Sequence, residues 1–315
     1  MRSSKIYEAL LIGCGNIGAG YDLNNEYVQT HLKGYLNSKL FNVSIFDINE
    51  TYSKKIAKKY DVNYITEIDT IDFELFDSIS IATPTETHYT FLKKALKANV
   101  KVIICEKPIS LDVEELIQLN ELYIKGSSKI FVNYIRRFNS YFIELKAFIN
   151  SRIVEDQLQT VSIKYRKGFL NNCSHAIDLI EFLTDNKINF SSAQKLKLNY
   201  DFFEKDPTFS CVFINNEIEY SFIGLKNTDF IVFEIEFYFK KFRVKILDSG
   251  NEIVVEKLDD RNSDIEIIFS QKRCLFNYMI PVMNTVIECL KGNKKTDNFH
   301  ESIDLNKRLL DLIIK

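Results

Sequence analysis

The sequence lacks a long uninterrupted apolar run and an excess of charge of one sign. No segment reaches the roughly 18 consecutive apolar residues that a membrane-spanning helix needs. The longest candidate, 230–239, carries Glu234 and Glu236 in alternation, which is strand periodicity. Lys and Arg number 41 against 43 Asp and Glu, a net charge of −2. We therefore expect neither a membrane nor nucleic acid among the partners.

The sequence also lacks paired cysteine motifs. None of its six cysteines stands in a C-x-x-C spacing. That argues against a zinc site and against a disulfide scaffold, and it favours a reducing compartment. We therefore expect no metal and a cytoplasmic protein. The 315 residues, 46% of them hydrophobic, are enough to bury a sizeable core and suggest two domains.

A glycine-rich turn near the start of the chain is the most informative feature. The apolar run 6–12 is typical of a strand, and it ends in Gly13-Cys14-Gly15-Asn16-Ile17-Gly18, the G-x-G-x-x-G spacing. The first glycine permits a tight turn, the second lets a pyrophosphate approach the backbone, and the third lets the next helix pack closely. Free N–H groups at the helix start then bind phosphate. The turn, including Asn16 and Ile17, is the predicted cofactor-binding element.

Asp47 follows the second predicted strand, 43–46, where a carboxylate can accept hydrogen bonds from the ribose hydroxyls. It lies 29 residues after Gly18, whereas about 20 is usual. We interpret the polar segment 19–30 as a loop inserted before the next helix. A carboxylate repels a 2′-phosphate, and Ile48-Asn49 offers no arginine to receive one. The sequence therefore predicts NAD, with NADP less favoured.

Strands and helices alternate up to about residue 135. Apolar strands at 79–82, 100–105 and 129–134 are separated by helices, which implies a parallel sheet with right-handed crossovers. Ligands bind at the carboxyl ends of such strands. The segments after these strands should therefore line one crevice: Thr83-Pro84 with His88, Glu106-Lys107-Pro108, and Tyr134 to Arg137.

The second half of the chain has a different pattern. Successive strands with short turns predict a large, mainly antiparallel sheet, with strands at 160–165, 195–200, 210–214, 217–223, 230–239, 242–247, 253–257 and 265–269. Helices are expected at 174–183, 273–291 and 302–315. We divide the chain into a dinucleotide-binding domain, 1–135, and a substrate-binding and dimerisation domain, 136–315. An apolar sheet face predicts a homodimer or homotetramer.

These motifs resemble those of the Gfo/Idh/MocA family, named for glucose–fructose oxidoreductase and inositol dehydrogenase. The resemblance covers essentially the whole chain and rests on five blocks in the family's order: 13–18, 82–88, 106–108, 134–138 and 171–178. It implies a Rossmann doubly wound sheet followed by an α+β domain with a large open sheet. It also implies an NAD- or NADP-dependent dehydrogenase acting on a secondary alcohol of a sugar or cyclitol.

Hydride transfer of this kind needs groups that handle the hydroxyl proton. By resemblance Lys107 is the first candidate, since a partly desolvated lysine beside a nicotinamide suits that task; a surface lysine on a loop is the ordinary alternative. The resemblance also places His175 against the substrate hydroxyl, where an imidazole can take or return a proton. A histidine held on a helix face is its ordinary alternative. His88 is expected to support the cofactor crevice.

The substrate side departs from the family pattern. Many members carry an aspartate four residues before the histidine, and this position holds Asn171. Its amide can hydrogen-bond a sugar hydroxyl but cannot take a proton, which shifts acid–base work to Lys107 and His175. Tyr134, Arg136 and Arg137 are further candidates for substrate binding. An arginine fork suits a carboxylate or phosphate, with structural ion pairs as the alternative.

Two other functions stay open at this stage. One is a related enzyme that uses bound NAD transiently during glycosidic bond cleavage. The other is a non-catalytic protein that binds NAD and sugar and regulates a partner. Asn171 favours the second, while the presence of both Lys107 and His175 counts against it.

Overall fold

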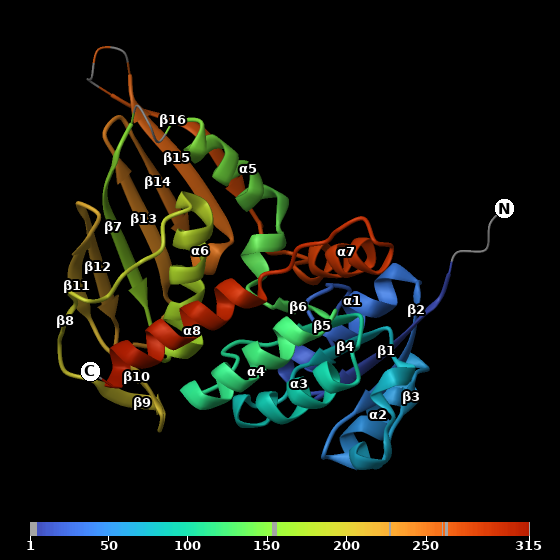
Figure 1. The fold of residues 1–315 in the computed structure, drawn as a ribbon. Coiled ribbons are helices and arrows are strands. Elements are labelled where there is room, and N and C mark those ends of the chain that lie inside the picture. Colours follow the sequence, from blue (N-terminus) through green and yellow to red (C-terminus); the bar gives the residue numbers. More distant parts are fainter. Residues whose placement is uncertain (1–4, 153–155, 227, 260, 262–263, 315) are drawn as a thin grey trace. The chain divides into compact units, whose positions relative to one another are not determined.

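The computed structural model describes residues 5–152, 156–226, 228–259, 261 and 264–314. The chain forms two compact units (Figure 1). The first comprises Met1–Ile135 and Phe276–Asp304, and the second comprises Arg136–Leu275 and Leu305–Lys315. The segment 276–304 therefore belongs with the N-terminal unit, although our division of the sequence assigned it to the C-terminal domain.

The first unit contains a six-stranded parallel sheet in the order β3-β2-β1-β4-β5-β6. Its strands are β1 (Tyr7–Ile12), β2 (Phe41–Phe46), β3 (Asn63–Tyr64), β4 (Ser78–Ile81), β5 (Val102–Cys105) and β6 (Lys129–Val132). Every residue of β4 and β5 is buried, as expected for strands covered on both faces. The order reverses between β1 and β4, which confirms the predicted doubly wound sheet.

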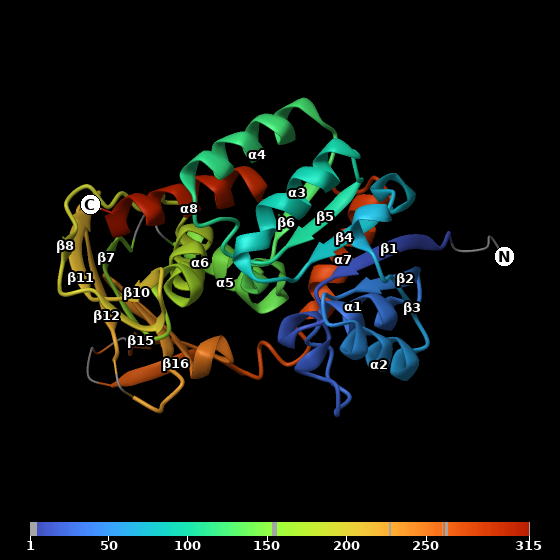
Figure 2. The same ribbon diagram turned by 90° about the horizontal axis from the view of Figure 1, so that it is seen from below.

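Helices cover both faces of this sheet. They are α1 (His31–Ser38), α2 (Glu50–Tyr60), α3 (His88–Lys97), α4 (Val113–Lys125) and α7 (Met279–Leu290). Figure 2 shows α1 and α2 on one side of the strands and α3 and α4 on the other. α7 comes from the returning segment and packs on α1 at Gly34, where an added Cβ would lie 2.8 Å from Met283 Cγ. A small residue in α1 thus permits this close helix pair.

The second unit contains an eight-stranded sheet in the order β16-β15-β14-β13-β7-β12-β11-β8. Its strands are β7 (Leu158–Tyr165), β8 (Gln194–Lys195), β11 (Cys211–Asn215), β12 (Ile218–Gly224), β13 (Phe233–Phe239), β14 (Phe242–Leu247), β15 (Glu252–Leu258) and β16 (Ile265–Lys272). All neighbours are antiparallel except β7 and β12, which are parallel. A large, mainly antiparallel sheet is therefore confirmed. β9 (Asn199–Phe203) and β10 (Asp206–Thr208) form a separate pair, so the predicted strand 195–200 is divided between β8 and β9.

One face of the large sheet is covered by helices. Figure 1 shows α5 (Ser140–Asn150) and α6 (Ser174–Thr184) over this face. Along β13, buried side chains alternate with partly exposed ones, which explains its strand periodicity. The sequence pattern did not identify α5. The last helix, α8 (Phe299–Ile314), starts three residues before the predicted 302, and Lys315 lies outside the described residues.

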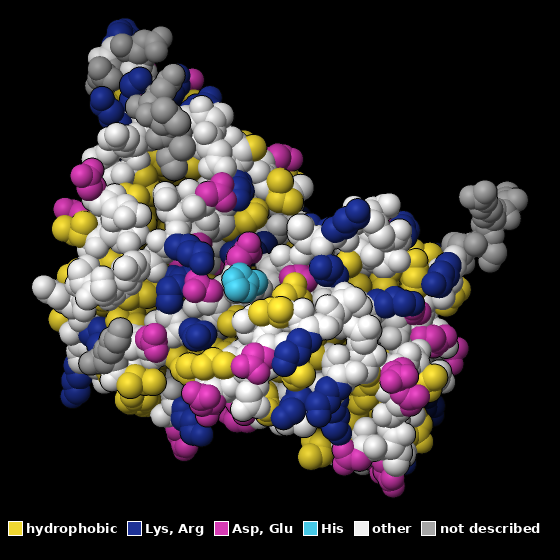
Figure 3. All heavy atoms as spheres, viewed as in Figure 1, with side chains coloured by type: hydrophobic (Ala, Val, Ile, Leu, Met, Phe, Trp, Pro, Cys, Tyr) yellow, Lys and Arg dark blue, Asp and Glu magenta, His cyan; other side chains and the backbone are white. Residues whose placement is uncertain are grey.

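Within the part of the chain that the structure describes, no helix is both long and apolar enough to cross a bilayer. Figure 3 shows basic and acidic side chains interspersed over the visible face.

Candidate functional site

The glycine turn lies at the carboxyl end of β1, where the strand order reverses. Gly13 has φ +94°, and an added Cβ would come 2.6 Å from the Ala82 carbonyl oxygen. A Cβ at Gly18 would collide with the carbonyl oxygen of Gly13, whereas one at Gly15 meets no heavy atom within 4 Å. Gly13 and Gly18 therefore permit close packing, and the backbone at Gly15 is open to a ligand.

The residues after Gly15 form a π-helical turn, Asn16–Gly20. Ala19 and Gly20 donate their N–H groups to the Gly15 carbonyl. No described residue accepts a hydrogen bond from the N–H groups of Asn16 or Ile17. Unpaired N–H groups at the start of a helical turn suit a phosphate, so this turn fits the pyrophosphate of a dinucleotide.

Asp47 follows β2 and is tied to the glycine turn. Its Oδ2 accepts the N–H of Cys14 at 2.7 Å, and its Oδ1 accepts the N–H of Asn49 at 2.8 Å. Burial and the nearby Asp47 charge raise the pKa of the Cys14 thiol to about 12, so this cysteine stays protonated. The carboxylate thus stands beside the turn, and its oxygens retain lone pairs for ribose hydroxyls.

The inserted segment 19–30 is an ordered loop closed by a buried aspartate. Asp22 is fully buried and accepts the N–H groups of Gln29 and Thr30 at 2.7 and 2.8 Å. The Thr30 hydroxyl donates to the same carboxylate at 2.9 Å and also caps α1. Tyr27 packs on Phe276 with ring centroids 4.4 Å apart, so the loop contacts the returning segment of the first unit.

Lys107 follows β5 directly after Glu106, whose carboxylate is held from two sides. Glu106 Oε1 lies 2.9 Å from His31 Nε2 and 2.6 Å from Asn133 Nδ2. Burial alone would raise the pKa of Glu106, but the bonds from His31 and Asn133 and the Lys107 charge outweigh it and hold that pKa below its ordinary value. Lys107 is half-buried next to a carboxylate that stays ionised.

His31 extends this contact into a buried polar network. Its Nδ1 lies 3.2 Å from the Ser80 hydroxyl, and Ser80 in turn contacts the Tyr35 hydroxyl at 2.8 Å. His31, Ser80 and Tyr35 are all fully buried. Such a connected network fixes side-chain positions more firmly than its separate bonds would. It therefore holds Glu106, and with it the start of the Lys107 segment.

His88 joins two of the predicted crevice segments. Its Nδ1 lies 2.8 Å from the Pro108 carbonyl oxygen, and its Nε2 lies 2.9 Å from that of Thr83. Burial lowers the pKa of His88, so at neutral pH the uncharged ring donates one of these two bonds. Because the side chain is 1% exposed, its geometry fits the expected supporting role in the crevice.

Three of the predicted substrate residues are largely buried. Tyr134 is 3% and Arg136 is 7% exposed. Arg136 Nη2 donates to the Ser249 carbonyl at 2.6 Å, and its guanidinium lies 4.1 Å from the Phe233 ring centroid. Arg137 Nε donates to Asp178 at 2.7 Å, an ion pair with a nearly inaccessible carboxylate. These contacts hold both arginines within the protein interior, although Arg136 Nε is buried without a hydrogen-bond partner. A role in substrate binding stays a prediction for both.

Asn171 and His175 lie on one continuous stretch of the second unit. Asn171 belongs to the π-helical turn Phe169–Cys173, and His175 is in the first turn of α6. Asp206, from β10, accepts the N–H groups of Leu170 and Asn171 at 2.7 and 2.8 Å. A buried carboxylate from a distant strand therefore fixes the turn that leads into His175.

The structure thus brings together the glycine turn, Asp47, Thr83, Pro84, His88, Glu106 and Lys107 at the carboxyl ends of β2, β1, β4 and β5. It brings Asn171 and His175 together in the second unit. A meeting of Lys107 with His175 stays a prediction. Sequence reasoning missed Asn133, the contact of His31 with Glu106, and Asp206. For Asn133 a signal existed, because it directly follows β6.

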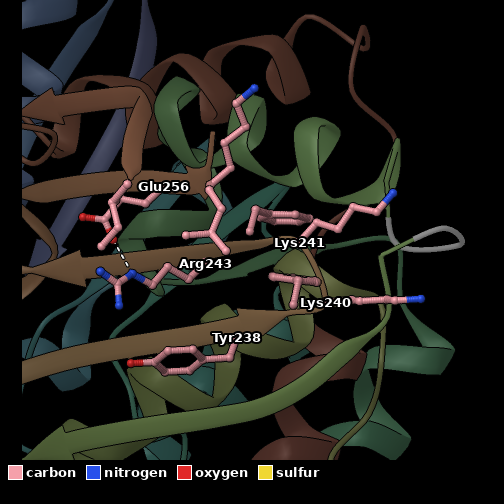
Figure 4. Close-up of a pocket in the computed structure, with 10 residues that line it drawn as sticks. Tyr238, Lys240, Lys241, Arg243 and Glu256 are labelled. Atoms are coloured by element: carbon pink, nitrogen blue, oxygen red, sulfur yellow. Dashed lines mark hydrogen bonds and ion pairs between the residues drawn. The ribbon is translucent and has the colours of Figure 1, made fainter. Parts of the chain in front are cut away.

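A separate hollow of about 220 Å³ lies at the β13–β14 turn. Figure 4 shows Arg243 pointing toward Glu256, with which it forms an ion pair, while Lys240 and Lys241 point away from that pair. Lys240, Lys241 and Arg243 diverge, so these three cations form no joint anion site there.

The fold and the turn geometry define a two-unit protein with a dinucleotide-binding Rossmann domain. Residues 7–134 match the family model GFO_IDH_MocA, described as an oxidoreductase family with an NAD-binding Rossmann fold. Residues 7–134 of this chain are therefore similar to the Gfo/Idh/MocA family. An inositol 2-dehydrogenase from Rhizobium meliloti is 31% identical over 190 residues, which are 55% of this chain and 53% of that protein. The chain spans about half the length of the curated relatives it matches.

Solved structures share the fold over nearly the whole chain. Levoglucosan dehydrogenase, in complex with NADH and levoglucosan, has a TM-score of 0.79 at 15% identity, covering 98% of this chain and 96% of that one. The transcriptional regulator Gal80p from Kluyveromyces lactis has a TM-score of 0.70 at 15% identity, covering 99% and 92%. At these identities the likeness establishes the fold, which enzymes and a regulator both use.

Proposed function

We propose that this protein is an NAD-dependent oxidoreductase that transfers a hydride between nicotinamide and a secondary hydroxyl or ketone carbon of a sugar, cyclitol or nucleotide-sugar. One observation carries the proposal. The open glycine turn, Asp47 and the Glu106-Lys107 segment lie at the carboxyl ends of neighbouring parallel strands in one sheet. That edge is where doubly wound sheets bind their ligands.

Bound NAD supplies the hydride acceptor. The chain's own residues hold the substrate and move the proton. Lys107 donates a hydrogen bond to the reacting oxygen and stabilises the negative charge that develops there. His175 takes the hydroxyl proton as hydride leaves and returns it in the reverse direction. Asn171 hydrogen-bonds a neighbouring hydroxyl and orients the ring.

The cofactor form follows from Asp47. Its carboxylate accepts hydrogen bonds from free ribose hydroxyls and repels a 2′-phosphate. Ile48, the next residue, is 95% exposed and offers no positive charge. NAD should therefore bind more tightly than NADP, and a lower dissociation constant for NADP would contradict the assignment.

The proposal is tested by incubating the purified full chain with NAD and a panel of free, phosphorylated and nucleotide-linked sugars and cyclitols. Formation of NADH is followed by its absorbance. We expect NADH with at least one member of the panel. Tight NAD binding with no turnover on any member would contradict the proposal.

A regulatory protein is the second candidate function. Two observations favour it: the fold is shared with the transcriptional regulator Gal80p, and Asn171 stands where many family members carry an aspartate. A regulator would bind NAD and sugar without producing NADH, and its dissociation constant for a partner would change with those ligands. The panel experiment therefore separates the two functions.

We also propose that the protein forms a homodimer or homotetramer through the second-unit sheet and works in the cytoplasm. The face of this sheet opposite α5 and α6 exposes Ile214 at 60%, Ile223 at 37% and Ile267 at 60%. We propose that these isoleucines form part of the association surface. Among the described residues all six cysteines are free, which supports a reducing compartment.

A further inference from the structure

Arg166 is a buried cation at the start of the turn that carries Asn171. Only 9% of it is exposed, and its guanidinium lies 4.9 Å from the Phe202 ring centroid. Nη1 donates to the Phe230 carbonyl at 2.9 Å. Nε is buried without a hydrogen-bond partner, and no carboxylate among the described residues lies within ion-pair distance of this guanidinium. The protein thus buries a positive charge and does not neutralise it directly.

The other buried or half-buried arginines of this unit have acidic neighbours. Arg137 pairs with Asp178 at 2.7 Å, and Arg308 pairs with Glu181 at 2.7 Å. Arg136 lies in the field of Asp178 and packs so tightly on Gly250 that an added Cβ would come 2.5 Å from its Nε. Because an unpaired buried charge is unfavourable for folding, Arg166 requires an explanation. Arg136 also has an Nε that is buried without a hydrogen-bond partner, but its charge lies in the field of the nearby Asp178.

A second cation and an aromatic surface accompany Arg166. Lys167 is exposed, and its Nζ lies 5.6 Å from the same Phe202 ring. Phe202 is 42% exposed, and its neighbours on β9 are also exposed, Tyr200 at 54% and Phe203 at 39%. An accessible ring close to two cations can stack on a sugar or base while the cations bind an attached anion.

Arg166 is held against the proposed substrate turn by backbone contacts. Its carbonyl accepts a hydrogen bond from Asn172 Nδ2 at 2.6 Å. Two residues further on, the Gly168 N–H donates to the Thr208 hydroxyl at 3.0 Å, next to the bonds that Asp206 makes to the same turn. The position of Arg166 relative to Asn171 is thus fixed within the second unit.

We propose that Arg166, with Lys167 and Phe202, recognises an anionic group, a phosphate or a carboxylate, on the substrate. The proposal rests on the oxidoreductase function argued above, in which Asn171 contacts the sugar. A guanidinium presents several N–H donors in a fixed plane, which matches the oxygens of both anions. In this proposal Arg166 binds the anion, a role that the sequence suggested for Arg136 and Arg137.

The test measures binding of glucose, glucose 6-phosphate, glucuronate and UDP-glucose by calorimetry with the full chain, without NAD so that its pyrophosphate does not compete. The wild type should bind at least one anionic sugar about 10-fold or more tightly than glucose, as a charge-assisted hydrogen bond allows. The phosphate and carboxylate probes distinguish the two anions. In Arg166→Met the affinity for the anionic sugar should fall to the affinity for glucose. Equal binding of all four sugars by the wild type, or unchanged preference in Arg166→Met, overturns the proposal.

Two further variants make the result specific. Arg152→Met is the matched control, because Arg152 also stacks on a ring, Phe148 at 4.0 Å, but stands on the exposed surface; it should keep the anion preference. If Arg166→Met does not fold, Arg166→Lys keeps the charge, loses the planar fork, and should still weaken binding of the anionic sugar by roughly 10-fold. Wild-type affinity in that variant overturns the proposal.

The two proposals fail in different ways. If an anionic sugar binds through Arg166 but no sugar gives NADH, the anion site is supported and the oxidoreductase function is contradicted. If neutral sugars give NADH, and wild type and Arg166→Met have the same affinities for all sugars, the anion site is contradicted and the oxidoreductase function is supported.

Discussion

At the scale of single residues, substitutions of Lys107 and His175 should affect turnover but not cofactor binding. Lys107→Ala and His175→Ala should each lower turnover by roughly 10² or more, the scale of lost general acid–base catalysis. The dissociation constant for NAD should stay nearly unchanged in both, because we propose that the phosphate and ribose of NAD are bound at the glycine turn and Asp47. Steady-state kinetics with calorimetry checks this, and near-normal turnover in both variants would remove the mechanism.

Glu106 gives a prediction on pH. Its folded-state pKa is lowered, so the ionised carboxylate stabilises the fold above the unfolded-state pKa, about 4.3. That contribution is lost as the pH falls through the lower folded-state value. The free energy of unfolding should therefore be higher in wild type than in Glu106→Gln at pH 7, and the difference should shrink below about pH 4.

Chemical denaturation at several pH values measures this difference. Glu114→Gln is the control, since Glu114 is exposed on α4 and its replacement should change stability little. If wild type and Glu106→Gln differ in the free energy of unfolding by the same amount at pH 7 and in acid, the assignment of an ionised, stabilised carboxylate is contradicted.

The role of a residue was predictable from the sequence only where its place next to a predicted strand or helix indicates that role. Gly13 and Lys107 follow apolar strands, and strand ends in a parallel sheet are ligand sites, so their positions could be argued from the chain alone. The contact of His31 with Glu106 joins residues 75 apart, and that of Asp206 with Asn171 joins residues 35 apart. No local pattern encodes such pairs, because they form only when distant elements pack.

At the scale of elements, β10 should control the turn before α6. Asp206→Ala leaves the buried N–H groups of Leu170 and Asn171 without their acceptor, which costs about 1–3 kcal/mol. If the turn shifts, Asn171 and His175 are misplaced, and kcat should fall by roughly 10-fold or more while NAD affinity holds. Asp206→Asn retains one acceptor oxygen and should recover part of kcat.

The control for this prediction is Asp201→Ala on the neighbouring β9, where the side chain is exposed. Kinetics and thermal unfolding are measured on all three variants. Wild-type kcat in Asp206→Ala would mean that Asp206 has only a structural role.

The element pattern was largely predictable in the first unit and less so in the second. The predicted strands of the parallel sheet are short, largely apolar runs separated by helices, which is a clear sequence pattern. The two-residue strand β3, whose residues are exposed, was not predicted. In the second unit β7 pairs with β12 in parallel across a gap of more than 50 residues. Alternation along a strand indicates which side chains share a face, but it does not indicate the neighbouring strand. The helix α5 was missed, and the predicted strand 195–200 proved to be two strands.

At the scale of the whole molecule, assembly of the units also depends on contacts that composition does not reveal. The segment 276–304 returns to the first unit because α7 packs on α1 at Gly34 and the Met279 N–H donates to the Val28 carbonyl at 3.2 Å. The apolar periodicity of α7 predicts a buried helix face, yet it fits either sheet equally well. The inserted loop 19–30 supplies part of that contact, which gives the loop a structural role.

The open face of the large sheet gives the prediction on assembly. Its centre carries ion pairs, Lys164 with Glu234 and Glu236 at 3.5 Å and Lys245 with Glu256 at 3.0 Å. Exposed isoleucines lie on both sides of this charged centre. Two copies related by a twofold axis can bury these isoleucines against each other and keep the ion pairs. In a monomer the same isoleucines stay exposed to water. A glutamate at one of these positions would bring an unpaired charge into the interface.

Ile214→Glu and Ile267→Glu should each raise the dissociation constant of the assembly by roughly 10- to 100-fold, the equivalent of losing one buried isoleucine. Sedimentation velocity over a range of protein concentrations measures this shift. Ile124→Glu is the matched control, because Ile124 is 68% exposed on α4 of the other unit and should leave the assembly intact. If the wild type sediments as a monomer at all concentrations, or if all three variants assemble equally, the exposed isoleucines of this sheet face do not hold the protein together.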